Sequence, residues 1–290
     1  MRRDKFAGRY AIKLGSSVLM ALCNFIIQSL LPRAISVDDY AFYSYNLNVF
    51  TSVVVIANLS TSSAMVAKYS KKCEDIGYIK FYFAFFASMA ILLSVGMVGL
   101  YQSESVRGSF GGQTLVSVVL GLEASVLIKL VADVVSIYDA AAISRFPSAM
   151  QVLQRVALCI FVLVFFLLGN LKLEYFYLGQ ILVVAIVVII LLFAFFCDYR
   201  KQYPRPINRG MNEYVGEYFT FCRPLIFSSF ISQGIVILMN HSLMKYSGTK
   251  EQAMFGAAWQ LNTLVAYVFS PYAELMKREL TSRPVRSLWL

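Results

Sequence analysis

Three charged side chains, Glu123, Lys129 and Asp133, lie in an otherwise hydrophobic segment that runs from Thr114 to Ile137. Lys129 and Asp133 are four residues apart, so in a helix they share one face and can form an ion pair. In one interpretation this pair neutralises itself and fixes helix packing, while Glu123 extends toward the outer surface. In the other, Lys129 is a cation in an aqueous cavity that attracts a phosphate-bearing substrate, and Asp133 holds it in place. Both remain open.

Uncharged polar side chains recur at helical spacing in three further hydrophobic segments. They are Ser17, Asn24 and Gln28, with Ala21 on the same stripe, in the first segment; Asn48, Ser52 and Asn58 in the second; and Gln233 and Asn240 in the seventh. Such groups either bond between helices or face a wet cavity. Because three segments carry them, a cavity that sugars could follow is favoured. The candidate substrate-binding residues are Lys129, Asp133, Asn24, Gln28, Asn48, Ser52, Gln233 and Asn240.

A pair of adjacent acids, Asp38 and Asp39, could hold a catalytic metal in a membrane glycosyltransferase. The local sequence favours another interpretation. Ser36 is a good N-cap, and acids are favourable in the first turn of a helix. We therefore expect a capped helix start here and no catalytic residues.

Motifs for soluble-enzyme chemistry are absent from the sequence. There is no GxxxxGK[ST], GxGxxG or HExxH pattern, and His241 is the single histidine. ATP hydrolysis within this chain, a multi-histidine metal site and a bound cofactor are therefore not expected. The net charge of +10 could indicate nucleic-acid binding in a soluble protein. Here the cations are grouped by loop, so membrane topology explains them and no nucleic acid is expected.

Composition places the chain in the bilayer. Of its 290 residues, 59% are hydrophobic and only 14% are charged, against about 25% charged in ordinary soluble domains. Eight hydrophobic segments have the length of a membrane-spanning helix, which predicts an all-α integral membrane protein. They run near Leu14–Leu31, Ala41–Leu59, Phe81–Tyr101, Thr114–Ile137, Ala149–Leu168, Tyr175–Phe196, Pro224–Met244 and Ala253–Tyr272.

The Lys and Arg residues predict the orientation. Twenty of the 26 fall on the side of the N-terminus, Arg145 and Arg155 among them, and five fall on the opposite side. The positive-inside rule therefore places both termini in the cytoplasm. The expected units are a six-helix lobe at residues 1–200, a cytoplasmic linker at 201–223, two helices of an incomplete second lobe at 224–280 and a short tail at 281–290.

Several short motifs resemble one transporter family. Residues 31–45, LPRAISVDDYAFYSY, follow the spacing R-x-L-x-x-x-[DE]-Y-[GA]-x-Y. The positions are occupied by Arg33, Ile35, Asp39, Tyr40, Ala41 and Tyr43, with Ile and Ala where Leu and Gly are commoner. This stretch resembles the one after the first helix of Wzx-type O-antigen flippases of the MOP (multidrug/oligosaccharidyl-lipid/polysaccharide) superfamily. Residues 59–72 resemble that family's second cytoplasmic turn, 222–230 the opening of its seventh helix, and 256–258 that of its eighth.

The resemblance implies two six-helix lobes around a central cavity in the bacterial inner membrane. It implies transport of an oligosaccharide on undecaprenyl pyrophosphate between leaflets, with the bilayer, that substrate and other polysaccharide-assembly proteins as partners. The family has about twelve or more spans, so this chain would be one lobe and part of the other, and its transport could be impaired. The alternatives are a membrane glycosyltransferase or polysaccharide polymerase, and a multidrug exporter of the same superfamily.

Overall fold

The structure is a computed structural model that describes residues 6–141, 143–169, 171–203 and 211–262. These residues are helical with short connections and include no strand. The helices are α1 (Phe6–Ala34), α2 (Val37–Ala57), α3 (Thr61–Tyr69), α4 (Gly77–Leu100), α5 (Glu104–Ser109), α6 (Leu115–Ala140), α7 (Arg145–Leu168), α8 (Leu173–Gln202), α9 (Met211–Ser242) and the π-helical turn η1 (Leu243–Ser247). Residues 249–262 are also helical.

The prediction of a multi-span helical membrane protein is confirmed. Six of the described helices are long and apolar enough to cross a membrane, and α2 with α3 makes a seventh candidate. They match the first seven predicted segments in order. The eighth, 253–272, begins within the helical residues 249–262 and otherwise lies outside the described residues.

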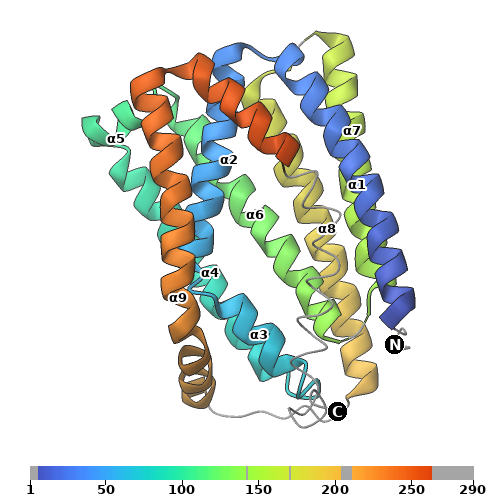
Figure 1. Ribbon diagram of the computed structural model, residues 1–290. Helices are drawn as coiled ribbons and strands as arrows, with labels where there is room; N and C mark the ends of the chain where they lie inside the picture. Colours follow the sequence, from blue (N-terminus) through green and yellow to red (C-terminus); the bar gives the residue numbers. More distant parts are fainter. Residues whose placement is uncertain (1–5, 142, 170, 204–210, 263–290) are drawn as a thin grey trace, which may run out of the picture.

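The helices form one bundle in which sequence neighbours are often not spatial neighbours (Figure 1). The most extensive contact joins α1 to α7 at one edge, and α9 packs on α2, α3 and α4 at the other edge. Between them, α6 and α8 pack together and carry much of the core. We call the end where α1 begins and where α6 and α8 end the basal end.

The second predicted segment, which ends near Leu59, agrees with the end of α2 at Ala57 to within two residues, but the helical path extends further. It bends by 57° between α2 and α3 and then continues as a helix to Tyr69. Most of residues 59–72, which resemble a cytoplasmic turn of the flippase family in sequence, are thus helical in the structure. Leu59 and Ser60 at the bend have φ values of 49° and 60°, a conformation that side chains disfavour. Neighbouring hydrogen bonds, described below, stabilise this bend.

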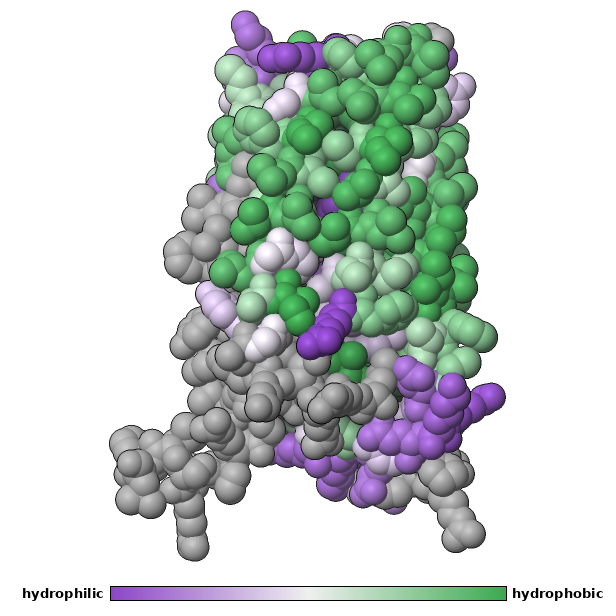
Figure 2. All heavy atoms as spheres, turned by 90° about the vertical axis from the view of Figure 1, so that its right-hand side faces the viewer, coloured by the Kyte–Doolittle hydropathy of each residue, from purple (hydrophilic) through white to green (hydrophobic). Residues whose placement is uncertain are grey.

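Lipid explains why so many large apolar side chains are exposed. Figure 2 views the edge that carries α1 and α7, where hydrophobic side chains form a broad belt and hydrophilic ones gather at its two ends. The exposed residues at this edge include Val18, Leu19, Leu22 and Phe25 of α1, and Ile160, Val164 and Leu167 of α7. Hydrocarbon tails solvate such a belt, so it incurs no hydrophobic penalty in a bilayer.

The basal half of α9 is held against the connection between α3 and α4. Tyr214 donates a hydrogen bond to Asp75 at 2.7 Å, and Glu217 accepts bonds from Tyr78 at 2.6 Å and Lys68 at 3.3 Å. Residues 211–223, expected within a linker, are thus the beginning of α9. The expected separation of two lobes stays a prediction, because α9 packs directly on helices of the first.

A glycine allows this close packing. A Cβ atom at Gly77 would lie 2.0 Å from the Tyr214 hydroxyl. We expect Gly77→Ala to push Tyr214 away from Asp75 and to lower the melting temperature in detergent by roughly 2–8 °C. Gly99→Ala on the same helix is the control, because a Cβ there meets nothing within 4 Å. Equal melting temperatures for the two variants would contradict the importance of this contact.

Candidate functional site

A cavity of about 340 Å³ lies between the α1–α7 pair and the rest of the bundle. Its volume is within the usual range for small-molecule sites. Five of the eight candidate residues line it, namely Asn24, Gln28, Asn48, Ser52 and Gln233. They come from α1, α2 and α9, so the structure brings together polar side chains from all three predicted stripes. The other described lining residues include Tyr43, Thr51, Arg155, Gln180, Trp259 and Gln260.

The charged residue in the wall of this cavity is Arg155 of α7. Arg155 was predicted to lie with the cations at the basal side. In the structure it is the eleventh residue of α7, well inside the helix. It therefore lies about 15 Å along the helix axis, near mid-membrane depth. No Asp or Glu is among the described lining residues, and none of them forms an ion pair with Arg155. Among the described residues, the cavity wall therefore carries one positive charge and no carboxylate to neutralise it.

Two further wall residues have hydrogen-bonding capacity that the protein does not use. The Gln180 side chain is buried, and its Oε1 has no hydrogen-bond partner. The Thr51 Oγ1 is also without one. Buried polar atoms are nearly always bonded, so atoms like these in a cavity wall are positions where a ligand can bond. Neither Arg155 nor Gln180 was among the candidates predicted from the sequence. Arg155 was counted with the basal cations, and Gln180 is a single amide in a hydrophobic segment.

Lys129 and Asp133 form the predicted ion pair but do not line the cavity. The hydroxyl of Tyr82 also donates to Asp133, and Lys129 donates to Ser62 of α3 at 3.3 Å. The first interpretation of this pair, self-neutralisation with a packing role, therefore fits its surroundings. The second interpretation places Lys129 in the cavity, and Lys129 is not among the described lining residues.

These bonds continue to the bend between α2 and α3. Asn58 donates to the Tyr82 hydroxyl at 3.1 Å and accepts from Thr61 Oγ1 at 2.7 Å. Ser60 Oγ lies 3.2 Å from Ser229 Oγ of α9. Asn58, predicted as part of a polar stripe, thus stabilises the end of α2 and does not contact the cavity.

Asn240 and Glu123 are likewise bonded to other helices. Asn240 accepts hydrogen bonds from Asn48 at 3.2 Å and from Gln252 at 3.0 Å. Glu123 accepts one from Ser94 of α4 at 2.5 Å. Asn240 therefore connects helices beside the cavity and is absent from its wall.

The expected helix start at Ser36 is confirmed. Ser36 is the N-cap of α2, and its hydroxyl accepts a bond from the backbone N–H of Asp39 at 3.0 Å. The same hydroxyl donates to the Asp39 carboxylate at 2.9 Å. Asp38 and Asp39 both lie in the first turn, where acids interact favourably with the helix dipole.

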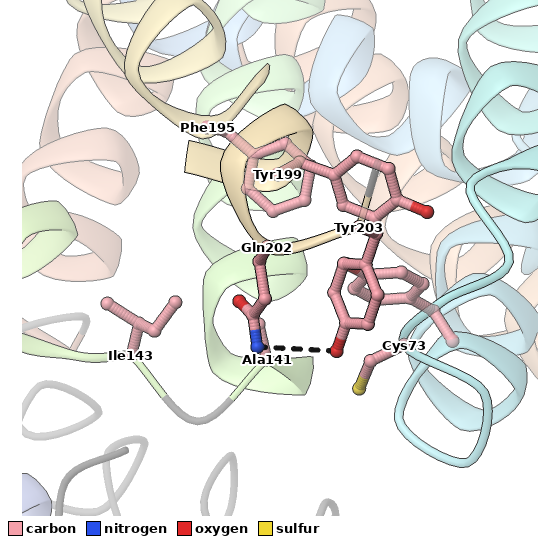
Figure 3. A pocket seen from close by; sticks show the side chains of 8 residues that line it. Cys73, Ala141, Ile143, Phe195, Tyr199, Gln202 and Tyr203 are labelled. Atoms are coloured by element: carbon pink, nitrogen blue, oxygen red, sulfur yellow. Dashed lines mark hydrogen bonds between the residues drawn. The ribbon is translucent and has the colours of Figure 1, made fainter. Parts of the chain in front are cut away.

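A second, much smaller cavity of about 30 Å³ lies at the basal end (Figure 3). Aromatic side chains surround it, among them Tyr69, Phe195, Tyr199 and Tyr203, and Gln202 donates to the Tyr203 hydroxyl at 3.4 Å. That volume holds about one or two water molecules. This cavity is too small for a sugar or a phosphate-bearing lipid, so of the two cavities described here the larger one is the candidate site.

Solved structures with the same arrangement of helices identify the fold. A chain described as "protein A" aligns with a TM-score of 0.75 at 11% identity, covering 96% of this chain and 64% of that one. The MATE multidrug transporter DinF-BH, solved as a complex, aligns with a TM-score of 0.69 at 10% identity, covering 96% of this chain and 66% of that one. This chain has the MATE transporter fold. The expected resemblance is therefore confirmed at the level of the fold, a multi-span helical bundle similar to a MATE transporter.

The two solved chains are longer than this one. The chain spans about two thirds of the length of each. No family model and no curated protein matches the sequence. The likeness at 10–11% identity concerns the fold alone. What a MATE fold transports depends on its cavity, so function has to be argued from the wall residues.

Proposed function

We propose that the chain moves a lipid-linked oligosaccharide, an O-unit on undecaprenyl pyrophosphate, across the bacterial inner membrane for polysaccharide or O-antigen synthesis. The observation that carries the proposal is Arg155, a cation that has no carboxylate partner among the described wall residues and lies among neutral hydrogen-bonding side chains. A guanidinium binds phosphate oxygens well, and amide and hydroxyl groups match sugar hydroxyls. One cavity therefore offers partners to both polar parts of such a lipid.

The orientation in this proposal follows the charge distribution. Arg200 and Lys201 end α8, and Arg145 begins α7, all at the basal end. By the positive-inside rule the basal end faces the cytoplasm. The substrate would then enter from the basal side and leave at the opposite end.

A multidrug exporter is the second candidate, because one similar solved structure is of a multidrug transporter. The cavity wall argues against cationic drugs as cargo. Its described residues include Arg155 and no carboxylate, so a cation entering it would be repelled. A membrane glycosyltransferase is less favoured, because Asp38 and Asp39 have a capping position in α2.

The test is deletion of the gene followed by rescue with this 290-residue chain and with a form extended to two full lobes. We expect deletion to remove surface polysaccharide and to leave lipid-linked precursor in the cytoplasmic leaflet. Restored polysaccharide would support the proposal, and comparison of the two forms would tell how much the second lobe contributes. Unchanged polysaccharide together with altered drug resistance would select the exporter.

A further inference from the structure

The Gln180 side chain in the cavity wall lacks a hydrogen-bond donor for its amide oxygen. It is only 5% exposed, it belongs to α8, and its Oε1 has no hydrogen-bond partner. A buried amide atom without a partner is costly, and proteins rarely keep one unless something else bonds to it. Because Gln180 lines the candidate cavity, a bound ligand can supply that bond.

The chemistry of an amide narrows what the ligand presents there. A carboxamide both donates and accepts, so a hydroxyl or acetamido group, which also does both, can satisfy it. A phosphate group only accepts, and a hydrocarbon tail does neither. Of the three parts of the proposed lipid, the sugar is therefore the one that can donate a hydrogen bond to Gln180 Oε1. The unpartnered hydroxyl of Thr51 in the same wall offers a second bond of the same kind.

The position of Gln180 relative to Arg155 points to one part of the substrate. The two residues lie on α7 and α8, which pack against each other. Arg155 is thirteen residues before the end of α7 and Gln180 is seven residues after the start of α8. Since these helices are antiparallel neighbours, the two residues differ in depth by about 10 Å, with Gln180 farther from the basal end.

We infer that Gln180 determines specificity for the sugar unit attached to the phosphate, by hydrogen-bonding its hydroxyl or acetamido group while Arg155 binds the phosphate. This rests on the proposed function and adds to it the part of the substrate that is recognised. The cavity of about 340 Å³ has room for the phosphate end and the first sugar, the part of the substrate that lies within about 10 Å of Arg155. Discrimination is therefore expected at the first sugar.

The chain provides its own reporter for a binding experiment. It contains two tryptophans, Trp259 in the cavity wall and Trp289, so Trp289→Phe leaves Trp259 as the fluorophore. The purified full chain carrying Trp289→Phe is titrated with undecaprenyl pyrophosphate and with undecaprenyl-pyrophosphoryl-N-acetylglucosamine, and native mass spectrometry counts bound lipids in parallel. We expect tighter binding of the sugar-bearing lipid.

The Gln180→Met variant tests the inference. It should lose that preference, roughly 3- to 10-fold in affinity, while binding of the bare pyrophosphate lipid is unchanged. Gln154→Met is the matched control, because Gln154 is a buried glutamine next to Arg155 that is not in the cavity wall. If Gln180→Met does not fold, as judged by its melting temperature, Gln180→Asn replaces it, since the shorter amide should lose the same preference.

The outcomes separate the two proposals. A sugar preference that persists in the Gln180 variants, or that Gln154→Met removes equally, would overturn the role of Gln180 and leave the proposed function standing. Failure of the unaltered cavity to bind either lipid, by fluorescence and by mass, would overturn the proposed function and the role of Gln180 with it.

Discussion

An Arg155→Met variant is expected to restore less than about a tenth of the surface polysaccharide that the unaltered chain restores. Arg155 is the charged residue in the described cavity wall, and the described residues give it no carboxylate. A hydrogen bond to a charged group contributes about 1.5–3 kcal/mol, which corresponds to roughly 10- to 150-fold in binding. Arg155→Lys should be intermediate, because it keeps the charge and loses the planar two-pronged geometry.

The protein fold should survive this change. Removing a cation that has no acidic partner leaves no buried charge behind, so the melting temperature of Arg155→Met should equal that of the unaltered chain within about 2 °C. Gln154→Met is again the adjacent control and should restore polysaccharide normally. Full restoration by Arg155→Met would show that this cation is not needed to bind the pyrophosphate.

Lys129→Met should affect stability far more than it affects the cavity. It leaves the Asp133 side chain, which is 4% exposed, without its cation. Removing one partner of a buried ion pair typically lowers the free energy of unfolding by about 3–5 kcal/mol. We expect a large fall in the melting temperature and in the yield of folded protein in detergent.

The double variant Lys129→Met with Asp133→Asn distinguishes a packing role from a substrate-binding role. Both charges are then gone, and Tyr82 can still donate to the amide oxygen of the substituted side chain, so most of the lost stability should return. Polysaccharide synthesis should return with it. A stable double variant that supports no synthesis would instead favour Lys129 as a residue that contacts the substrate.

The spans were predictable because the thickness of the hydrocarbon slab fixes helix length, and seven segments matched helices in order. The bend after α2 was not. Left-handed backbone is normally marked by glycine, whereas Leu59 and Ser60 adopt it here without one. Asn58, beside the bend, is bonded to Tyr82 and Thr61, and a contact such as the one with Tyr82, 24 residues away, cannot be read from a local pattern.

Five of the eight candidate residues line the cavity and three do not, again because a local sequence pattern does not show contacts between helices. Periodicity indicates which side chains share a helix face, and Asn24, Gln28, Asn48, Ser52 and Gln233 do share a cavity. It does not reveal whether a polar group already has a partner, as Asp133 and Asn240 do. Arg155 was missed because it was counted with the basal cations, although it lies six residues inside the predicted segment 149–168. A cation so far inside a hydrophobic segment could have been recognised from the sequence as a candidate cavity residue.

The pairing of α1 with α7 has a consequence for how the protein is made. About 110 residues separate the end of α1 from the start of α7. A ribosome adds about 5–20 residues per second, so roughly 5–20 s pass between the synthesis of α1 and that of α7, the helix it contacts most extensively. During that interval Asn24 and Gln28 lack the helices they later face, and Lys13 lacks Asp139 until α6 is complete. The first helix is therefore expected to stay in the bilayer for several seconds before the helices that face its polar side chains have been synthesised.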